Sequence, residues 1–147
     1  SYPRIPGLSP RSFLRGEVGE DYTLEGVDVE AFTYPALPGL SRATNGWMAS
    51  RALVPRMRRF QPDLVLAYWV YPDGAAAKRA ARRLGVPCIV GARGSDIHVR
   101  SGLNAHLTRR TLQGLDAILT VSHAMRDTAI ATFGAILLWA LIGRKKA

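Results

Sequence analysis

Apolar runs of strand length alternate with helical patterns through the middle of the chain. Residues 27–32 alternate apolar and polar side chains, whereas residues 63–70 (DLVLAYWV) form a near-continuous apolar run, typical of a strand buried on both faces. The pattern predicts strands at 27–32, 63–70, 86–91 and 116–121, and helices at 47–60, 74–84, 103–112 and 123–133. This alternation indicates an α/β fold, in which a parallel sheet carries helical crossovers on both faces.

Local signals predict where the helices begin and end. Residues 34–45 are rich in Pro, Gly and Asn and read as a loop, so the next helix is expected to start near Trp47, with that side chain facing inward. Asp73 and Ser122 are placed to cap the two helices that follow them, because short polar side chains accept hydrogen bonds from first-turn N–H groups. Gly85 is placed to end the helix that Asp73 begins.

Three predicted loops, at 71–74, 92–96 and 121–123, leave the carboxyl ends of parallel strands. In an open parallel sheet a ligand binds beyond these ends, so the loops are expected to share one cleft wall. The candidate binding residues are Asp73, Gly74, Arg93, Gly94, Asp96 and Ser122. The glycines let a ligand approach the backbone, the aspartates and the serine exchange hydrogen bonds, and the arginine offers forked donors to an anion. The loops therefore predict a hydroxyl-rich or phosphorylated ligand.

Four of these candidates also have a purely structural interpretation. Asp73 and Ser122 serve equally well as helix caps, Gly94 as a turn residue, and Asp96 as the cap of the following turn. The sequence shows no Ser-His-Asp order, no paired catalytic carboxylates, no Walker-type loop and no GxGxxG motif. No catalytic residue is therefore assigned.

Composition narrows the class of protein. The 147 residues are 48% hydrophobic, enough for a sizeable core. A single cysteine, Cys88, excludes an internal disulfide framework, and the scattered His and Cys residues have no metal-ligand spacing. No run of 18 apolar residues predicts an ordinary membrane-spanning helix.

Positive charge is concentrated in the middle of the chain. The net charge is +9, and residues 41–110 hold thirteen basic and three acidic side chains. A basic stretch attracts phosphate, whether in nucleic acid, anionic lipid head groups or phosphorylated small molecules; the alternative is a solvated, arginine-rich surface.

Taken together, the loop motifs resemble one known family. A strand entered by Pro-Asp leads to Pro72-Asp73-Gly74, the next strand leads to Gly94-Ser95-Asp96, and an aspartate-led strand ends in Val121-Ser122. In this order and at these separations, residues 61–134 resemble the N-terminal half of family 4 glycosyltransferases. Arg93 stands where many relatives have a histidine, so a histidine-based role at that position is not expected.

The resemblance implies half of a GT-B fold, in which two Rossmann-like domains face each other across a cleft. Such enzymes transfer a sugar from a nucleotide-sugar donor to a hydroxyl acceptor, with no cofactor and no required metal. The N-terminal domain mainly holds the acceptor, a lipid-linked sugar or polysaccharide, and the C-terminal domain holds the donor. By analogy Gly94, Ser95 and Asp96 line the cleft near the reacting sugar, with Asp73, Gly74 and Ser122 beside them. Many members act at the cytoplasmic face of a membrane, so a cytoplasmic location with peripheral membrane contact is expected.

The resemblance also predicts the domain organisation. Residues 1–134 are expected to form a partial family 4-like N-terminal domain without its donor-binding partner. Residues 135–147 contain AILLWALI followed by a basic end, and read as an out-of-frame tail, a core helix without its partner, or an interfacial amphipathic segment. We therefore expect no sugar transfer by this chain alone, and poor solubility from an exposed sheet edge.

Two other classes of protein compete with this interpretation. A non-catalytic basic module could bind nucleic acid, but the chain lacks the aromatic-basic stacking pattern and helix-turn-helix spacing of such modules, so nucleic acid is not the expected partner. A peripheral membrane protein held by residues 137–146 is the third hypothesis.

Overall fold

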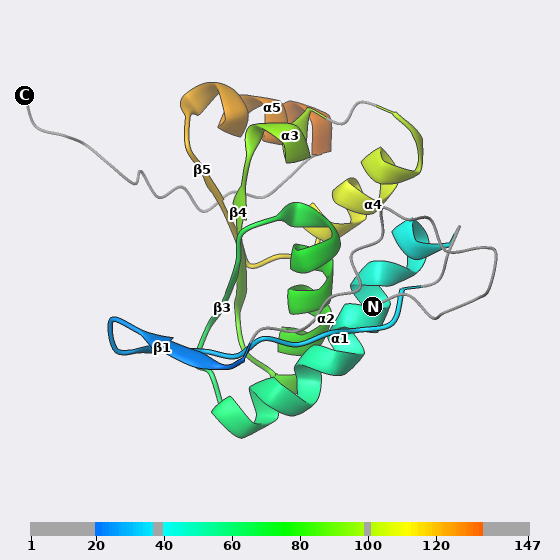
Figure 1. The fold of residues 1–147 in the computed structure, drawn as a ribbon. Helices are drawn as coiled ribbons and strands as arrows, with labels where there is room; N and C mark the ends of the chain where they lie inside the picture. The colour runs from blue at the N-terminus through cyan, green and yellow to red at the C-terminus, as the bar shows by residue number, and fades with distance from the viewer. Residues whose placement is uncertain (1–19, 37–39, 99–100, 134–147) are drawn as a thin grey trace, which may run out of the picture.

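The computed structural model describes residues 20–36, 40–98 and 101–133, which form an α/β arrangement (Figure 1). The predicted tail at 135–147 and the turn-rich start of the chain lie outside the described residues. A small hairpin comes first, and three parallel strands with their helices follow it.

The parallel sheet confirms the central prediction. Its strands are β3 (Val65–Ala67), β4 (Cys88–Ala92) and β5 (Ala117–Thr120), side by side in the order β3-β4-β5. Ala67 pairs with Val90, which pairs with Ile118. Asp116 fixes the register of β5, because its Oδ2 accepts a hydrogen bond from the Cys88 N–H at 2.8 Å and its own N–H donates to the Cys88 carbonyl at 3.1 Å.

Three helices lie on one face of this sheet, as Figure 1 shows: α1 (Ser41–Phe60), α2 (Ala75–Leu84) and α4 (Gly102–Leu112). The four-residue helix α3 (Gly94–Ile97) follows the carboxyl end of β4, and α5 (His123–Phe133) follows that of β5. Because the strands run in sequence order and parallel crossovers are right-handed, the crossovers through α2 and α4 lie on the same face. The expectation of crossovers on both faces is therefore wrong for the described strands.

The core forms where the alanine-rich side of α2 meets β4. Ala77 and Ala81 pack with Cys88 and Val90, and small side chains let the helix approach the sheet closely. On the other face Leu66 is 45% exposed. The prediction that residues 63–70 form a strand buried on both faces is wrong, since β3 is shorter and lies at the edge of the described sheet.

The predicted strand at 27–32 is also shorter and more exposed than expected. It is β2 (Val27–Val29), which pairs antiparallel with β1 (Tyr22–Leu24) outside the parallel sheet. Glu25 and Gly26 have φ angles of 49° and 82°, so the hairpin turns through two residues of positive φ. Val27 is 64% exposed and Val29 is half-buried, so no residue of this strand is fully buried.

The helix boundaries agree with prediction at α4 and α5 and differ at α1. This helix begins at Ser41, inside the predicted loop, and continues through Pro55 to Phe60. Trp47 is 42% exposed rather than inward, and the Arg51 guanidinium stacks 5.1 Å from its ring centroid. Gly85 ends α2 in the left-handed region at φ 75°, as predicted.

Candidate functional site

The carboxyl ends of the three parallel strands meet at one edge of the sheet (Figure 1). Segment η1 (Val70–Gly74) follows β3, α3 follows β4 after Arg93, and α5 follows β5 after Val121 and Ser122. Adjacent parallel strands in register bring these connections together. The structure thus gathers the predicted loops on one surface.

Two carboxyl groups lie near enough there for the charge of one to affect the pKa of the other. Asp96 is buried, with 7% of its surface exposed, and its Oδ2 accepts a hydrogen bond from the Arg93 N–H at 3.1 Å. Asp73 is exposed as a residue, but the protein atoms around its carboxyl group raise its pKa by removing water, and the negative charge of Asp96 raises it further. Asp73 makes no cap hydrogen bond to α2, so the predicted capping role is wrong. An acid held near a second acid in this way is typical of functional sites.

Arg93 lies beside this pair with its guanidinium over aromatic rings. The guanidinium carbon is 5.9 Å from the ring centroid of Tyr68 and 5.8 Å from that of Trp69. None of the ion pairs formed by the described residues includes Arg93. Stacking holds the side chain while its N–H donors stay available to an anion or a hydroxyl oxygen.

The two glycines of the predicted site differ in what they do. A Cβ on Gly74 would lie 2.8 Å from the Trp69 carbonyl oxygen and 2.8 Å from Val90 Cγ2, so Gly74 is needed for packing of η1 against β4. A Cβ on Gly94 would meet only His98 Cδ2, at 3.9 Å. Packing within the described chain therefore does not explain Gly94, and its open surface leaves room for a ligand.

The two serines of the predicted site, Ser95 and Ser122, also differ in their roles. Ser122 Oγ accepts a hydrogen bond from the Met125 N–H at 3.2 Å, which confirms its predicted role as the cap of α5. Ser95 is exposed in the first turn of α3, next to Asp96. Asp73, Arg93 and Ser95 are thus exposed at this surface, whereas Asp96 is buried and Gly94 is half-buried.

Comparison with known protein families identifies the family of the chain. A family model described as glycosyl transferase 4-like domain matches residues 6–136. The chain belongs to the glycosyl transferase 4-like family. The parallel sheet and its helices are the Rossmann-like half of a GT-B fold, as the resemblance predicted. Membership of this family indicates a function related to glycosyl transfer. No curated protein matches its sequence significantly.

Two further features of the glycosyl transferase 4-like domain concern metals and membranes. Among the described residues, no three His, Cys, Asp or Glu side chains gather as ligands for a metal ion. Within the same residues, no helix combines the length and apolarity needed to cross a bilayer.

The sequence did not identify every residue at this surface of the glycosyl transferase 4-like domain. Tyr68 was predicted only as part of a buried strand, whereas its ring is 61% exposed and stacks with Arg93. Trp69, which belongs to the same predicted buried strand, is 44% exposed and lies at the site. The aromatic pair directly before the Tyr71-Pro72-Asp73-Gly74 loop was the available signal.

Proposed function

We propose that this domain forms the acceptor-side wall of a sugar-transferase cleft. The observation that carries the proposal is the gathering of Asp73, Asp96 and Arg93 at the carboxyl ends of adjacent parallel strands. Carboxylates accept hydrogen bonds from sugar hydroxyls, and the guanidinium donates to a hydroxyl or phosphate oxygen. The acceptor class is a hydroxyl-bearing molecule, either a lipid-linked sugar or a polysaccharide.

The proposed reaction needs groups from both walls of such a cleft. The anomeric carbon of the donor sugar forms a bond to the acceptor oxygen and loses its bond to the diphosphate of the nucleotide. The proton of the acceptor hydroxyl passes to an oxygen of that departing diphosphate. Positive groups must stabilise the charge that develops on the departing diphosphate. In the proposal the nucleotide sugar is held by a second, facing domain, so the 147-residue chain does not turn over alone.

In this proposal, specific side chains of the site form hydrogen bonds to the hydroxyl groups of the acceptor. Asp96 is held by the Arg93 N–H, so its carboxylate has a fixed direction. Asp73 is exposed beside it, where it can accept a hydrogen bond from a second hydroxyl. Ser95 and the open surface of Gly94 complete the contact area. A cytoplasmic location, with the acceptor presented at a membrane surface, fits this proposal.

Acceptor binding can be tested on the isolated chain by following backbone amide signals in NMR. The probes are a panel of soluble oligosaccharides and short-chain polyprenyl diphosphate sugars. We expect signal changes centred on residues 93–97, and a roughly tenfold loss of affinity in Asp96→Asn, because a hydrogen bond to a charged group is lost.

Asp116→Asn is the matched control. Asp116 also accepts one backbone N–H bond, but it lies at the opposite end of the sheet, before β5. Equal loss in both variants, or signal changes confined to other surfaces, would contradict the assigned site. Sugar transfer by the purified chain with nucleotide-sugar donors would contradict the need for a second wall.

A further inference from the structure

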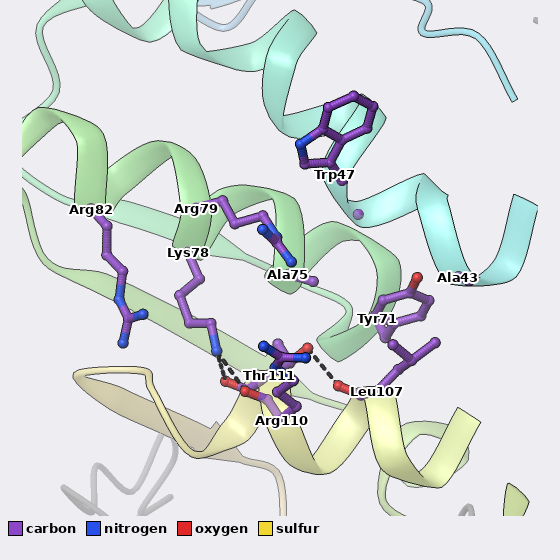
Figure 2. A pocket seen from close by; sticks show the side chains of 11 residues that line it. Ala43, Trp47, Tyr71, Ala75, Lys78, Arg79, Arg82, Leu107, Arg110 and Thr111 are labelled. Atoms are coloured by element: carbon purple, nitrogen blue, oxygen red, sulfur yellow. Dashed lines mark hydrogen bonds between the residues drawn. The ribbon is translucent and has the colours of Figure 1, made fainter. Parts of the chain in front are cut away.

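A second concave surface lies on the helical side of the domain, between α1, α2 and α4 (Figure 2). It encloses about 170 Å³, roughly ten times the space that one water molecule needs. None of the predicted acceptor-site residues lines it. We call it the helix pocket, and its position separates it from the surface at the carboxyl ends of the strands.

The helix pocket is lined by four cations: Lys78, Arg79 and Arg82 of α2, and Arg110 of α4. Among the described residues no acidic side chain lines it. The ion pairs of the described chain are made elsewhere, by Arg56, Arg59 and Arg126. Within the described part of the chain, no acidic side chain therefore neutralises the positive charge of the pocket.

Contacts on both sides of the pocket fix its walls. Lys78 Nζ donates to the carbonyl oxygens of Arg110 and Thr111, at 2.6 and 2.9 Å, and so ties α2 to the end of α4 (Figure 2). Tyr71 donates its hydroxyl hydrogen to the Arg42 carbonyl and forms the opposite wall. Arg79 is close enough to Tyr71 for its charge to oppose the rise in the Tyr71 pKa that burial causes. Hydrogen bonds thus hold Lys78 and Tyr71 in place at two sides of the cavity.

Crowding of like charges leaves the empty pocket electrostatically unfavourable. Burial, followed by the charges of Arg82 and Arg79, lowers the pKa of Lys78 to about 8; Arg110 acts in the same direction, and Cys88 on β4 opposes it. A bound anion would offset the repulsion among these cations. It would also favour the charged form of the lysine.

We propose that the helix pocket binds a phosphate-bearing group, held by Arg79, Arg82 and Arg110 with the Lys78 ammonium behind them. Guanidinium groups match phosphate oxygens with paired donors, and the ammonium has one N–H left after its two carbonyl bonds. The group is a free phosphorylated molecule or the head group of an anionic lipid. This inference does not rest on the proposed transferase function.

The test uses the full chain and inorganic pyrophosphate as the probe, with binding measured by calorimetry. The pocket variant is Arg79→Gln combined with Arg110→Gln. Its matched control combines Arg83→Gln with Arg109→Gln, which removes the same charge from the same two helices at exposed positions outside the pocket. We expect the pocket variant to lose roughly tenfold or more in affinity and the control to change by less than about threefold.

A parallel measurement separates the two sources of phosphate. Vesicles of phosphatidylglycerol with phosphatidylcholine replace pyrophosphate in a co-sedimentation assay. Loss of pyrophosphate binding in the pocket variant supports a free ligand, and loss of vesicle binding alone supports a lipid head group. Equal weakening in the pocket variant and its control would show only a general charge effect and would contradict the proposal. The proposal is also overturned if the wild-type chain binds neither pyrophosphate nor the vesicles.

The wild-type chain provides a check that needs no variant. The ¹³Cε signal of Lys78 is followed against pH with and without saturating pyrophosphate. We expect the pKa of Lys78 to rise from about 8 when the anion is bound, because the anion offsets the charges of Arg79, Arg82 and Arg110. An unchanged midpoint would place the anion elsewhere.

Discussion

At the scale of single residues, the acceptor-site proposal depends on a carboxyl pair that costs stability. Asp73 is partly desolvated and faces the charge of Asp96, and both effects favour its protonated form. No ion pair of the described chain neutralises it. A group kept in an unfavourable electrostatic position is expected where a ligand supplies the missing interactions.

This cost predicts a pH-dependent gain of stability in Asp73→Asn. The folded state raises the pKa of Asp73 above its usual 3.8, so it binds the proton more tightly than the unfolded state. The free energy of unfolding therefore falls as pH rises from 3.8 through the raised pKa, and the deficit persists at neutral pH. We expect Asp73→Asn to unfold at a higher temperature than wild type at pH 7, and the difference to disappear below about pH 4.

Thermal unfolding followed by circular dichroism from pH 3 to pH 8 measures this effect. Asp63→Asn is the control, since Asp63 is an exposed aspartate ahead of β3. If both variants show the same profile, the pairing with Asp96 does not destabilise Asp73.

The sequence predicted this surface better than it predicted individual roles. Ser122 caps α5 as expected, because an N-cap depends on residues three positions apart. Asp73 does not cap α2, since η1 leads into that helix through Gly74. The stacking of Arg93 on Tyr68 joins residues of two different strand ends, and no local pattern encodes that contact.

At the scale of elements, close packing of η1 against β4 depends on Gly74. Gly74→Ala would place a methyl group 2.8 Å from both the Trp69 carbonyl oxygen and Val90 Cγ2, and backbone atoms cannot move aside as a flexible side chain can. We expect a loss of about 1–3 kcal/mol in the free energy of unfolding. Urea unfolding measures it directly.

Gly94→Ala is the matched comparison. Its added methyl group meets only His98 Cδ2, at 3.9 Å, so the change in unfolding free energy should stay within about 0.5 kcal/mol. If Gly94→Ala weakens acceptor binding without loss of stability, the open surface at α3 serves the ligand. A large loss of stability in Gly94→Ala would instead assign this glycine to packing.

The elements themselves were predictable where one periodicity dominated. The periodic helix α4 and the apolar strand β5 were found to within a residue or two. Residues 63–70 were assigned too long a strand because an apolar run does not reveal where the chain leaves the sheet; here it turns into η1 at Val70. Of the β1–β2 hairpin only β2 was predicted, and as too long a strand, because both strands have three residues and are largely exposed.

At the scale of the whole molecule, the sequence shows that positive charge is concentrated in the middle of the chain, but it does not show which of these cations meet in the fold. The dipole of α2 favours cations toward its C-terminal end, so Lys78, Arg79 and Arg82 need no ligand to explain them when the sequence is considered alone. Their convergence with Arg110 requires α2 and α4 to lie on the same face of the sheet, which follows from strand order. A helical spacing that places 78, 79 and 82 on one side was the available signal, but it does not identify the facing helix.

The exposed edge of the described sheet makes self-association the last prediction. In the order β3-β4-β5, β3 is an outer strand, and Leu64, Leu66 and Tyr68 are between 45% and 61% exposed along it. An outer strand with exposed apolar side chains promotes pairing between copies, and a charge placed on such a strand prevents that pairing. We expect Leu66→Lys to shift sedimentation-velocity profiles toward monomer, while Leu103→Lys, at a 53% exposed position on α4, leaves them unchanged. The two variants add the same charge to the same residue type, so an equal shift in both would show that added charge alone improves solubility, and an effect of Leu66→Lys alone would assign the contact to β3.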